Sequence, residues 1–578
     1  MNRDPAPSSK PLDLVLAGWR HLDQQRPLAA WASWQRAIRA DEDQAAARIA
    51  LDRLATSAEL PASSRREYRF RAPRDESRRI RWDAAFLGHE LSDLEVASRA
   101  FAELFEADPS DADALHNRAL CLAWLGRNNE ALDSLDRLVG LLAEDDFEAA
   151  VAAWVLCETL RQGGGSETRA DEFRHTIDVP GRPRAMLDRL AGVAYLRRLP
   201  PPVDLGEDVT IDEWLDRELP ELDSSSRSLR IEEVPRVLAI VVASPAGLRF
   251  SLPSPEFLPL VVETIETSFG VAVEPVATPL PIPLLDAAAW TIRLPQWLEE
   301  GDRLRLYRES VEDYYENRWL RRVRHALGGR SPREIAATGA STEPATHARL
   351  EALIRFREEL ADRTASRELY QGYPFDRLRR RLGLPIRDAG TIDPTDPGCM
   401  GVAELDSLEL DSLEMTALVD AFRSALALGD DERTARFASR LLDGPGSPPA
   451  WIEPESLVAP LVRHAIAGGD PSEAGRRIDA AAESFPARRT IFRTWRAELH
   501  SRLDEPERAA GVYLTIIEGM SPDRGAHLAL DGAMTLRDDG HLDEARALAR
   551  RASELASRSG HPELERRVED FLDRIEFA

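Results

Sequence analysis

Arginine is the residue type whose spacing most suggests chemistry in this sequence. A guanidinium group forms paired hydrogen bonds with a carboxylate or a phosphate, so a run of arginines can contact nucleic acid or an acidic partner. No acidic residue interrupts the arginines between positions 318 and 333, which are Arg318, Arg321, Arg322, Arg324, Arg330 and Arg333. Four of these are candidate partner-binding residues: Arg321, Arg322, Arg324 and Arg330.

The charge of the whole chain argues against nucleic acid as the partner of this basic segment. Aspartate and glutamate number 101 against 75 basic residues, which gives a formal net charge of −26. Such a surface repels phosphate backbones unless a local patch overrides it. Residues 200–235 are acidic and bear prolines, so they offer carboxylates for internal ion pairs. We therefore expect a solvated or internally paired basic face, with nucleic acid disfavoured as a partner.

No set of residues has the spacing of a catalytic, metal or cofactor site. His89-Glu90 lacks the second histidine of a zinc-protease helix, and the sequence contains no GxSxG turn. Lys10 is the only lysine, which excludes a P-loop lysine and leaves no plausible Schiff-base site. The tract Gly163 to Ser166 is not followed by GK[ST], so it indicates a linker. We expect no catalytic residue, no metal, no cofactor and no enzymatic activity.

Cysteine usage and hydropathy indicate a cytoplasmic protein. Three scattered cysteines cannot form a disulfide framework and favour a reducing compartment; they are Cys121, Cys157 and Cys399. The first residues lack the apolar core of a signal peptide, and the apolar stretch at 237–243 is too short to span a bilayer. We therefore expect no membrane partner.

Small residues recur at both ends of the chain with the spacing of stacked helix pairs. Ala97 and Ala131 lie 34 positions apart, and apolar residues follow each of them on the same helix face. Leu135 and Leu138 are those residues in the second case. Further units are marked by Ala30 near the N-terminus and by Ala474, Ala509 and Ala545 near the C-terminus, with a weaker one from Gly429. The pattern predicts helical hairpins that touch through small side chains.

These residues resemble the tetratricopeptide repeat family over residues 12–162 and 455–573. The resemblance implies a superhelix whose concave groove binds segments of other proteins. In the unit that starts near Ala112, the groove positions include His116, Leu120 and Trp124, which are candidate partner-binding residues. No cationic clamp for a carboxylate lies there, so we expect an apolar or aromatic peptide, or a segment of the chain itself. Hairpins without a groove function are the alternative.

The middle of the chain predicts a different structure. Residues 163–234 read as an acidic linker with one short helix from Ile211 to Leu219. Val237 to Val242 and Leu248 to Leu252 predict a strand hairpin, followed by a helix that Ser254 caps. A further strand at Trp290 to Leu294 completes a small α+β module.

The segment Trp319 to Ile354 is similar to the toxin-binding domain of bacterial antitoxins. Gly328-Gly329 predicts a turn with positive φ, and Ser331 with Glu334 predicts a capping box at a helix start. We identify no DNA-binding helix pair upstream of it. The order of segments also resembles planctomycete-type tetratricopeptide proteins of undefined function, which informs the architecture alone.

The sequence thus predicts a mainly α protein with tetratricopeptide-like helical-hairpin repeats at both ends flanking a small α+β module. The expected function is a non-catalytic scaffold that binds other proteins in its helical-repeat grooves. The alternative is a regulatory protein that contacts nucleic acid or a toxin-like partner through residues 318–333. The expected domains are N-terminal repeats at 12–162, a linker at 163–234, the module at 235–300, a helical segment at 301–400 and C-terminal repeats at 401–578.

Overall fold

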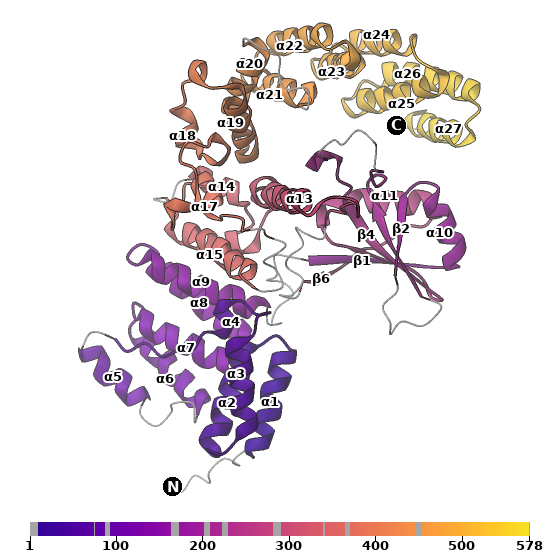
Figure 1. Ribbon diagram of the computed structural model, residues 1–578. Helices are drawn as coiled ribbons and strands as arrows, with labels where there is room; N and C mark the ends of the chain where they lie inside the picture. Colours follow the sequence, from indigo (N-terminus) through magenta and orange to yellow (C-terminus); the bar gives the residue numbers. More distant parts are fainter. Residues whose placement is uncertain are drawn as a thin grey trace. The chain divides into compact units, whose positions relative to one another are not determined.

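The computed structural model divides into two compact units, residues 1–392 and 393–578 (Figure 1). The residues that it describes are 10–73, 76–86, 93–162, 173–200, 209–221, 229–280, 291–338, 342–363, 370, 372–444 and 452–576. The tract at 163–166, His89-Glu90 and Trp290 lie outside these ranges.

The first unit begins with an array of antiparallel helices, in which α1 packs on α2 and α6, α7, α8 and α9 pack in succession. Their bounds are α1 Pro11–Asp23, α2 Pro27–Ala40, α3 Ala45–Thr56, α4 Ala62–Arg65, α5 Glu76–Phe86, α6 Leu94–Ala107, α7 Ala112–Trp124, α8 Asn128–Leu142 and α9 Phe147–Gln162.

Small residues face inward where these helices cross, as predicted. Ala97, Ala119 and Ala131 are fully buried. Gly18 is the tightest crossing, because a Cβ atom there would stand 2.2 Å from Nε1 of Trp34. Gly126, the second residue after the end of α7, has φ of +75°, a conformation that glycine adopts without strain. The helical hairpins therefore form where the repeat pattern indicates.

A six-stranded antiparallel sheet follows in the order β2-β3-β4-β5-β1-β6. The strands are β1 Phe173–Pro180, β2 Tyr195–Leu199, β3 Thr210–Leu215, β4 Val237–Ser244, β5 Gly247–Leu252 and β6 Val276–Pro279. Two helices, α10 Pro183–Ala191 and α11 Leu258–Phe269, pack with one face of the sheet in a single hydrophobic core. This core includes Val241 of β4, Phe250 of β5 and Ile265 of α11. The predicted hairpin is confirmed as β4 and β5.

The sheet extends further toward the N-terminus than the module at 235–300 that we expected. Residues 211–215 form part of β3, so the predicted helix from Ile211 to Leu219 is wrong. Asp212 and Glu213 are buried in that strand, where arginines of β2, Arg198 and Arg197, pair with them across the ladder. The acidic residues of this stretch suggested an exposed helix. The sequence around them does not show that arginines of another strand compensate their charge.

The return strand expected at Trp290 to Leu294 does not form in the described part of that stretch. Ile292 makes an isolated bridge with Arg236. Ser254 does not cap the following helix with its side chain; its Oγ accepts a hydrogen bond from Arg322 at 2.7 Å instead. The helix itself, α11, is present at the predicted place.

Helix α15, Pro344–Ala361, returns to the N-terminal array and packs against α9 (Figure 1). Arg349 stacks over the Trp154 ring at 4.8 Å, while Arg355, further along α15, pairs with Glu148 near the start of α9. The remaining helices of this unit are α13 Glu300–Asp313, a π-helical turn at Tyr314–Trp319, α14 Pro332–Thr338 and α17 Asp376–Arg381. In the sequence, the strands of the sheet therefore lie between α9 and α15, two helices of one array.

The second unit is helical throughout its described residues, with consecutive helices packed as pairs. Ala474, Ala509 and Ala545 are fully buried, and the weaker unit after Gly429 is helix α20 in a pair with α19. The bounds are α18 Val402–Asp406, α19 Met415–Leu428, α20 Asp431–Asp443, α21 Pro454–Ala467, α22 Pro471–Ser484, α23 Arg489–Arg502, α24 Pro506–Ile517, α25 Pro522–Asp538, α26 Leu542–Ser559 and α27 Pro562–Glu576.

Candidate binding sites

An extended segment of the chain lies against α7 in the N-terminal array. Residues 67–73 have no helix or strand assignment, and Asn117 of α7 holds their backbone. The Asn117 Oδ1 accepts a hydrogen bond from the Arg71 N–H at 2.7 Å, and its Nδ2 donates to the Arg71 carbonyl at 2.7 Å. Asn117 is fully buried, and a buried carboxamide needs hydrogen-bond partners for both its oxygen and its NH2 group. Arg71 alone supplies both.

The ring of Phe70 fills an aromatic site beside this backbone contact. Its centroid lies 5.1 Å from that of Trp124 and 5.3 Å from that of Phe101. Trp124 in turn stacks on Trp31 at 5.6 Å. Helices α2, α6 and α7 therefore build one aromatic cluster, and Phe70 is the residue that the extended segment contributes to it.

The groove residues that the repeat pattern predicted lie in this region. His116 and Trp124 are each 6% exposed and Leu120 is fully buried, so none of them presents a free surface. Burial, followed by the charge of Arg71, lowers the pKa of His116 to about 3, and a hydrogen bond with the Arg69 backbone acts in the opposite direction. An outside partner has to displace the chain's own segment to reach His116 and Trp124.

Three residues of this site were missed at the sequence level, namely Asn117, Phe70 and Phe101. Phe101, four positions after Ala97, is one of the apolar residues of the repeat pattern, which predicts only packing within its own helix pair. Asn117 could have indicated the site from the sequence. A carboxamide among alanines and leucines on a helix requires a polar partner that the helix itself does not supply. Phe70 gave no signal, since residues 67–73 show neither helical nor strand periodicity.

The segment is anchored at its N-terminal side by a second set of contacts. The Tyr68 hydroxyl donates to the Ser63 carbonyl at 2.9 Å. The Ser63 N–H donates to Glu359 of α15 at 2.7 Å, and the Thr159 hydroxyl of α9 donates to Ser63 Oγ at 2.7 Å. The turn that precedes the segment is therefore fixed to α9 and α15.

The basic segment is engaged with the chain's own groups. Arg318 pairs with Glu256 at 2.7 Å and with Asp313 at 3.2 Å. Arg330 donates from Nη1 to Glu343 at 2.9 Å. The internal pairing that we expected is present, but these carboxylates come from outside the acidic stretch at 200–235.

Of the other predicted arginines, Arg322 and Arg324 are covered, whereas Arg321 is exposed. Arg322 donates to Ser254 and lies over the Tyr314 ring at 5.4 Å. Arg324 is only 2% exposed and stacks on Trp319 at 4.7 Å. Partial desolvation and the charge of Arg333 lower the pKa of Arg321. The turn at Gly328-Gly329, where φ is +67° and +78°, brings Arg324 and Arg330 opposite one another. Arg318 and Arg322 both lie over the Tyr314 ring.

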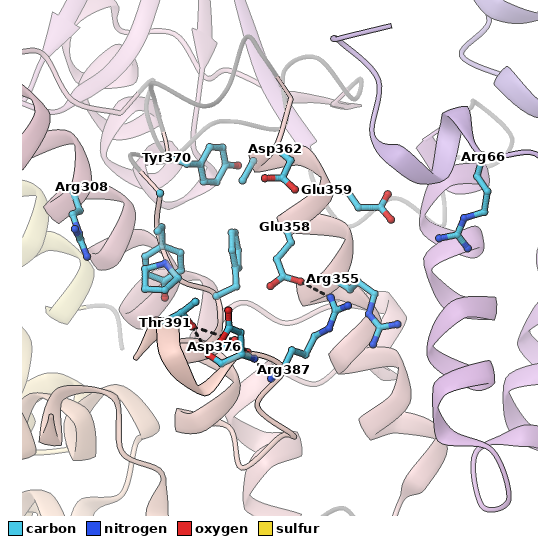
Figure 2. A pocket seen from close by; sticks show the side chains of 16 residues that line it. Arg66, Arg308, Arg355, Glu358, Glu359, Asp362, Tyr370, Asp376, Arg387 and Thr391 are labelled. Atoms are coloured by element: carbon cyan, nitrogen blue, oxygen red, sulfur yellow. Dashed lines mark hydrogen bonds and ion pairs between the residues drawn. The ribbon is translucent and has the colours of Figure 1, made fainter. Parts of the chain in front are cut away.

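A cavity of about 1120 Å³ lies beside the C-terminal end of α15 (Figure 2). Its lining carries charges of both signs, and Arg387 pairs with Glu358 at 3.3 Å. Tyr370, Tyr373 and Phe375 add aromatic surface. Because arginines and carboxylates are mixed around the space, the lining does not favour a ligand of one charge.

A second, smaller cavity of about 130 Å³ lies in the C-terminal unit between α21 and α23. Its apolar lining is formed by Ala459, Val462, Ile466, Ile478, Trp495 and Leu499, and its polar lining by Arg463, Glu498 and Arg502. Burial raises the pKa of Glu498; the charge of Arg502 lowers it, and the charge of Asp539 raises it further. The cavity combines an aromatic wall with a charged rim.

Within the described ranges, no three histidine, cysteine, aspartate or glutamate side chains are placed to hold a metal ion. All three cysteines are buried, and burial raises the pKa of Cys121 and Cys157 well above the usual value for a thiol. None of the helices that the structure describes combines the length and apolar character needed to cross a bilayer.

No known protein-family model matches the sequence. No curated protein matches it either. Similar solved structures include yeast Tom70, with 14% identity, coverage of 98% of this chain and 96% of that chain, and a TM-score of 0.21.

Two more solved structures are similar to the same extent. The TPR domain of P58(IPK) has 12% identity, coverage of 86% and 97%, and a TM-score of 0.17. The complex of Naa15/Naa10 bound to HypK-THB has 12% identity, coverage of 98% and 75%, and a TM-score of 0.20. At such TM-scores the chains do not superimpose as whole molecules, so the fold assignment rests on the helix packing of this chain itself.

Proposed function

We propose that this chain is a non-catalytic scaffold whose C-terminal helical array binds a segment of another protein. The observation that carries the proposal is the apolar cavity between α21 and α23, lined by Val462, Ile466 and Trp495. Both helices are the first members of consecutive packed pairs, so the cavity belongs to a face that the repeats form together.

The cavity has the size of an anchor site for one side chain. Its volume of about 130 Å³ is close to the roughly 150 Å³ of engineered apolar cavities that accept benzene. Burying a Leu or Phe side chain contributes about 1.5–3 kcal/mol, enough for the dominant contact of a small interface. Arg463, Glu498 and Arg502 at the rim then orient the polar groups of the bound segment.

The basic segment is the weaker candidate for partner binding. Arg318 and Arg330 already pair with Glu256, Asp313 and Glu343, and Arg324 is buried against Trp319. A nucleic acid would have to replace these contacts while approaching a chain of net charge −26.

The proposal is tested by selecting peptides from a displayed random library on the full-length chain and measuring their affinity by fluorescence anisotropy. Ile466→Asp places a charge in the cavity, and we expect at least a tenfold loss of affinity. Leu514→Asp is the matched control, because Ile466 is 42% and Leu514 39% exposed and only Ile466 lines the cavity. Equal affinities for the two variants, or no selected peptide, contradict the proposal.

A further inference from the structure

We infer that residues 67–73 are an internal ligand of the N-terminal array, and that the site beneath them accepts an extended segment of a partner protein in their place. The partner segment that fits carries an aromatic residue directly before a residue that is not proline. This site lies in the other compact unit from the cavity of α21 and α23, so the inference does not rest on the proposed function.

The backbone contact defines the first requirement for a ligand. Asn117 uses both ends of its carboxamide on the N–H and the carbonyl of a single residue, Arg71, each at 2.7 Å. A pair of hydrogen bonds of this kind recognises an extended backbone rather than a side chain. Any residue with a free N–H can therefore take the position of Arg71, whereas proline cannot.

The aromatic contact defines the second requirement. Phe70 precedes Arg71 and lies with its ring between Phe101 and Trp124, at 5.3 and 5.1 Å. Trp124 is supported from its other side by Trp31. A rigid aromatic wall of this kind selects a flat apolar side chain over an aliphatic or charged one.

Three other side chains of the segment are exposed and leave their positions unrestricted, namely Glu67, Arg69 and Ala72. Glu67 and Arg69 are exposed and pair with each other at 3.2 Å. Their ion pair is exposed, so it contributes little to holding the segment in place.

Tyr68 and Pro73 are covered as well, but Tyr68 bonds to Ser63, a residue of the chain's own preceding helix. The ring of Phe70 and the backbone of Arg71 are thus the two contacts with the array that a short motif of another protein has to reproduce.

The internal segment competes with any partner because it is tethered to its own site. Tethering of this kind corresponds to an effective concentration on the order of millimolar. A partner segment of equal quality therefore binds weakly to the wild-type chain, and tightly once the internal ring is removed. This competition makes the inference measurable.

The experiment uses the full-length chain and a fluorescently labelled synthetic peptide with the sequence of residues 66–73, followed by anisotropy. Phe70→Ala empties the aromatic site, so we expect this variant to bind the peptide at least tenfold more tightly than the wild type. Arg69→Ala is the matched control and should bind as the wild type does. Equal binding by Phe70→Ala and the wild type overturns the inference.

The role of Asn117 is tested on the peptide, so that a folding defect cannot obscure the result. A peptide methylated on the backbone nitrogen that corresponds to Arg71 loses the donor that Asn117 accepts. We expect it to bind Phe70→Ala at least tenfold more weakly than the unmodified peptide does. A peptide with Phe70 replaced by Ala should also bind at least tenfold more weakly. Unchanged affinity for either modified peptide overturns the inference.

A second copy of the chain is the competing occupant, because it carries the same segment. Sedimentation of the wild type and of Phe70→Ala distinguishes the two cases. We expect both to sediment identically at concentrations up to the micromolar range. A dimer that forms with the wild type and disappears with Phe70→Ala assigns the site to exchange between copies and overturns the inference of a partner protein.

Discussion

The absence of a single methyl group sets the distance between the first two helices. A Cβ atom at Gly18 would meet Trp34, whose indole N–H donates to the Val15 carbonyl at 3.2 Å. We expect Gly18→Ala to lower the free energy of unfolding by about 1–3 kcal/mol, because the indole has to move. Gly140→Ala is the control, since it lies inside α8 with open space around it and should gain about 0.5–1 kcal/mol. Chemical denaturation measures both; a loss of similar size at Gly140 contradicts this reading.

Arg379 is the charged residue whose removal should harm the first unit most. It is fully buried and pairs with Glu351 at 3.0 Å and with Asp376 at 3.1 Å. Burial raises the pKa of Glu351 and the charge of Arg379 opposes that rise, so the loss of Arg379 leaves this buried carboxylate with only its longer ion pair to Arg355, at 3.6 Å. We expect Arg379→Met to cost about 3–5 kcal/mol.

The matched control for this substitution is Arg387→Met. Arg387 and Arg379 both pair with Glu358. The Arg387 side chain is 52% exposed, so its loss should cost no more than about 1 kcal/mol. Urea denaturation at neutral pH compares the two variants. Similar midpoints for both would show that the buried network is energetically equivalent to a surface pair.

His116 makes the N-terminal array sensitive to acid. Its pKa is about 3 in the folded chain against 6.5 for the free side chain, so the folded state holds it neutral. The stability that this provides is complete above pH 6.5 and is lost as the pH falls toward 3. Relative to His116→Gln, the wild type should lose about 2–3 kcal/mol between pH 7 and pH 4.5. Parallel stability curves for the two proteins, measured in urea, would exclude this residue as the cause.

At the scale of elements, α15 completes an array whose preceding helix, α9, ends more than 180 residues earlier in the chain. Gln162 ends α9 and Pro344 begins α15, yet Trp154 and Arg349 of these helices stack at 4.8 Å. An amphipathic helix requires an apolar partner surface but does not specify which one. The sequence accordingly predicts helices in both places but not that they pack against each other.

This pairing predicts coupled protection from hydrogen exchange. Trp154→Ala, a substitution at a 5% exposed position of α9, should cost about 3–5 kcal/mol and expose the amides of α15 as well as those of α9. Phe437→Ala in α20 is the control, since that residue is equally buried in the other compact unit. If only α8 and α9 lose protection in Trp154→Ala, α15 is not an energetic part of the array.

At the scale of the whole molecule, the chain should not unfold in one step. Residues 1–392 and 393–578 form separate compact units, and each has its own buried clusters, such as that around Trp34 and that around Tyr513. Calorimetry should therefore give an unfolding enthalpy larger than the van't Hoff value. Equal calorimetric and van't Hoff enthalpies would mean that the two units unfold in one cooperative transition.

The sequence by itself determined the hairpins at both ends, because a small residue at a helix crossing and apolar residues four and seven positions later are local signals. Ala97, Ala131 and Ala509 are fully buried, as this pattern requires. The turn at Gly328-Gly329 was a local signal too, and it is present. Of the capping box predicted at Ser331, one half is present: Glu334 accepts hydrogen bonds from the Ser331 N–H and hydroxyl.

Only the tertiary structure decided what those local elements touch. The strand at Thr210–Leu215 was misread as a helix because its acids are neutralised by arginines of a neighbouring strand. The contact between Phe70 and Trp124, and the pairing of Asn117 with Arg71, join parts of the chain that share no periodicity. Contacts of this kind depend on the complete packing of the chain, since burial and charge compensation are properties of surroundings that distant residues supply.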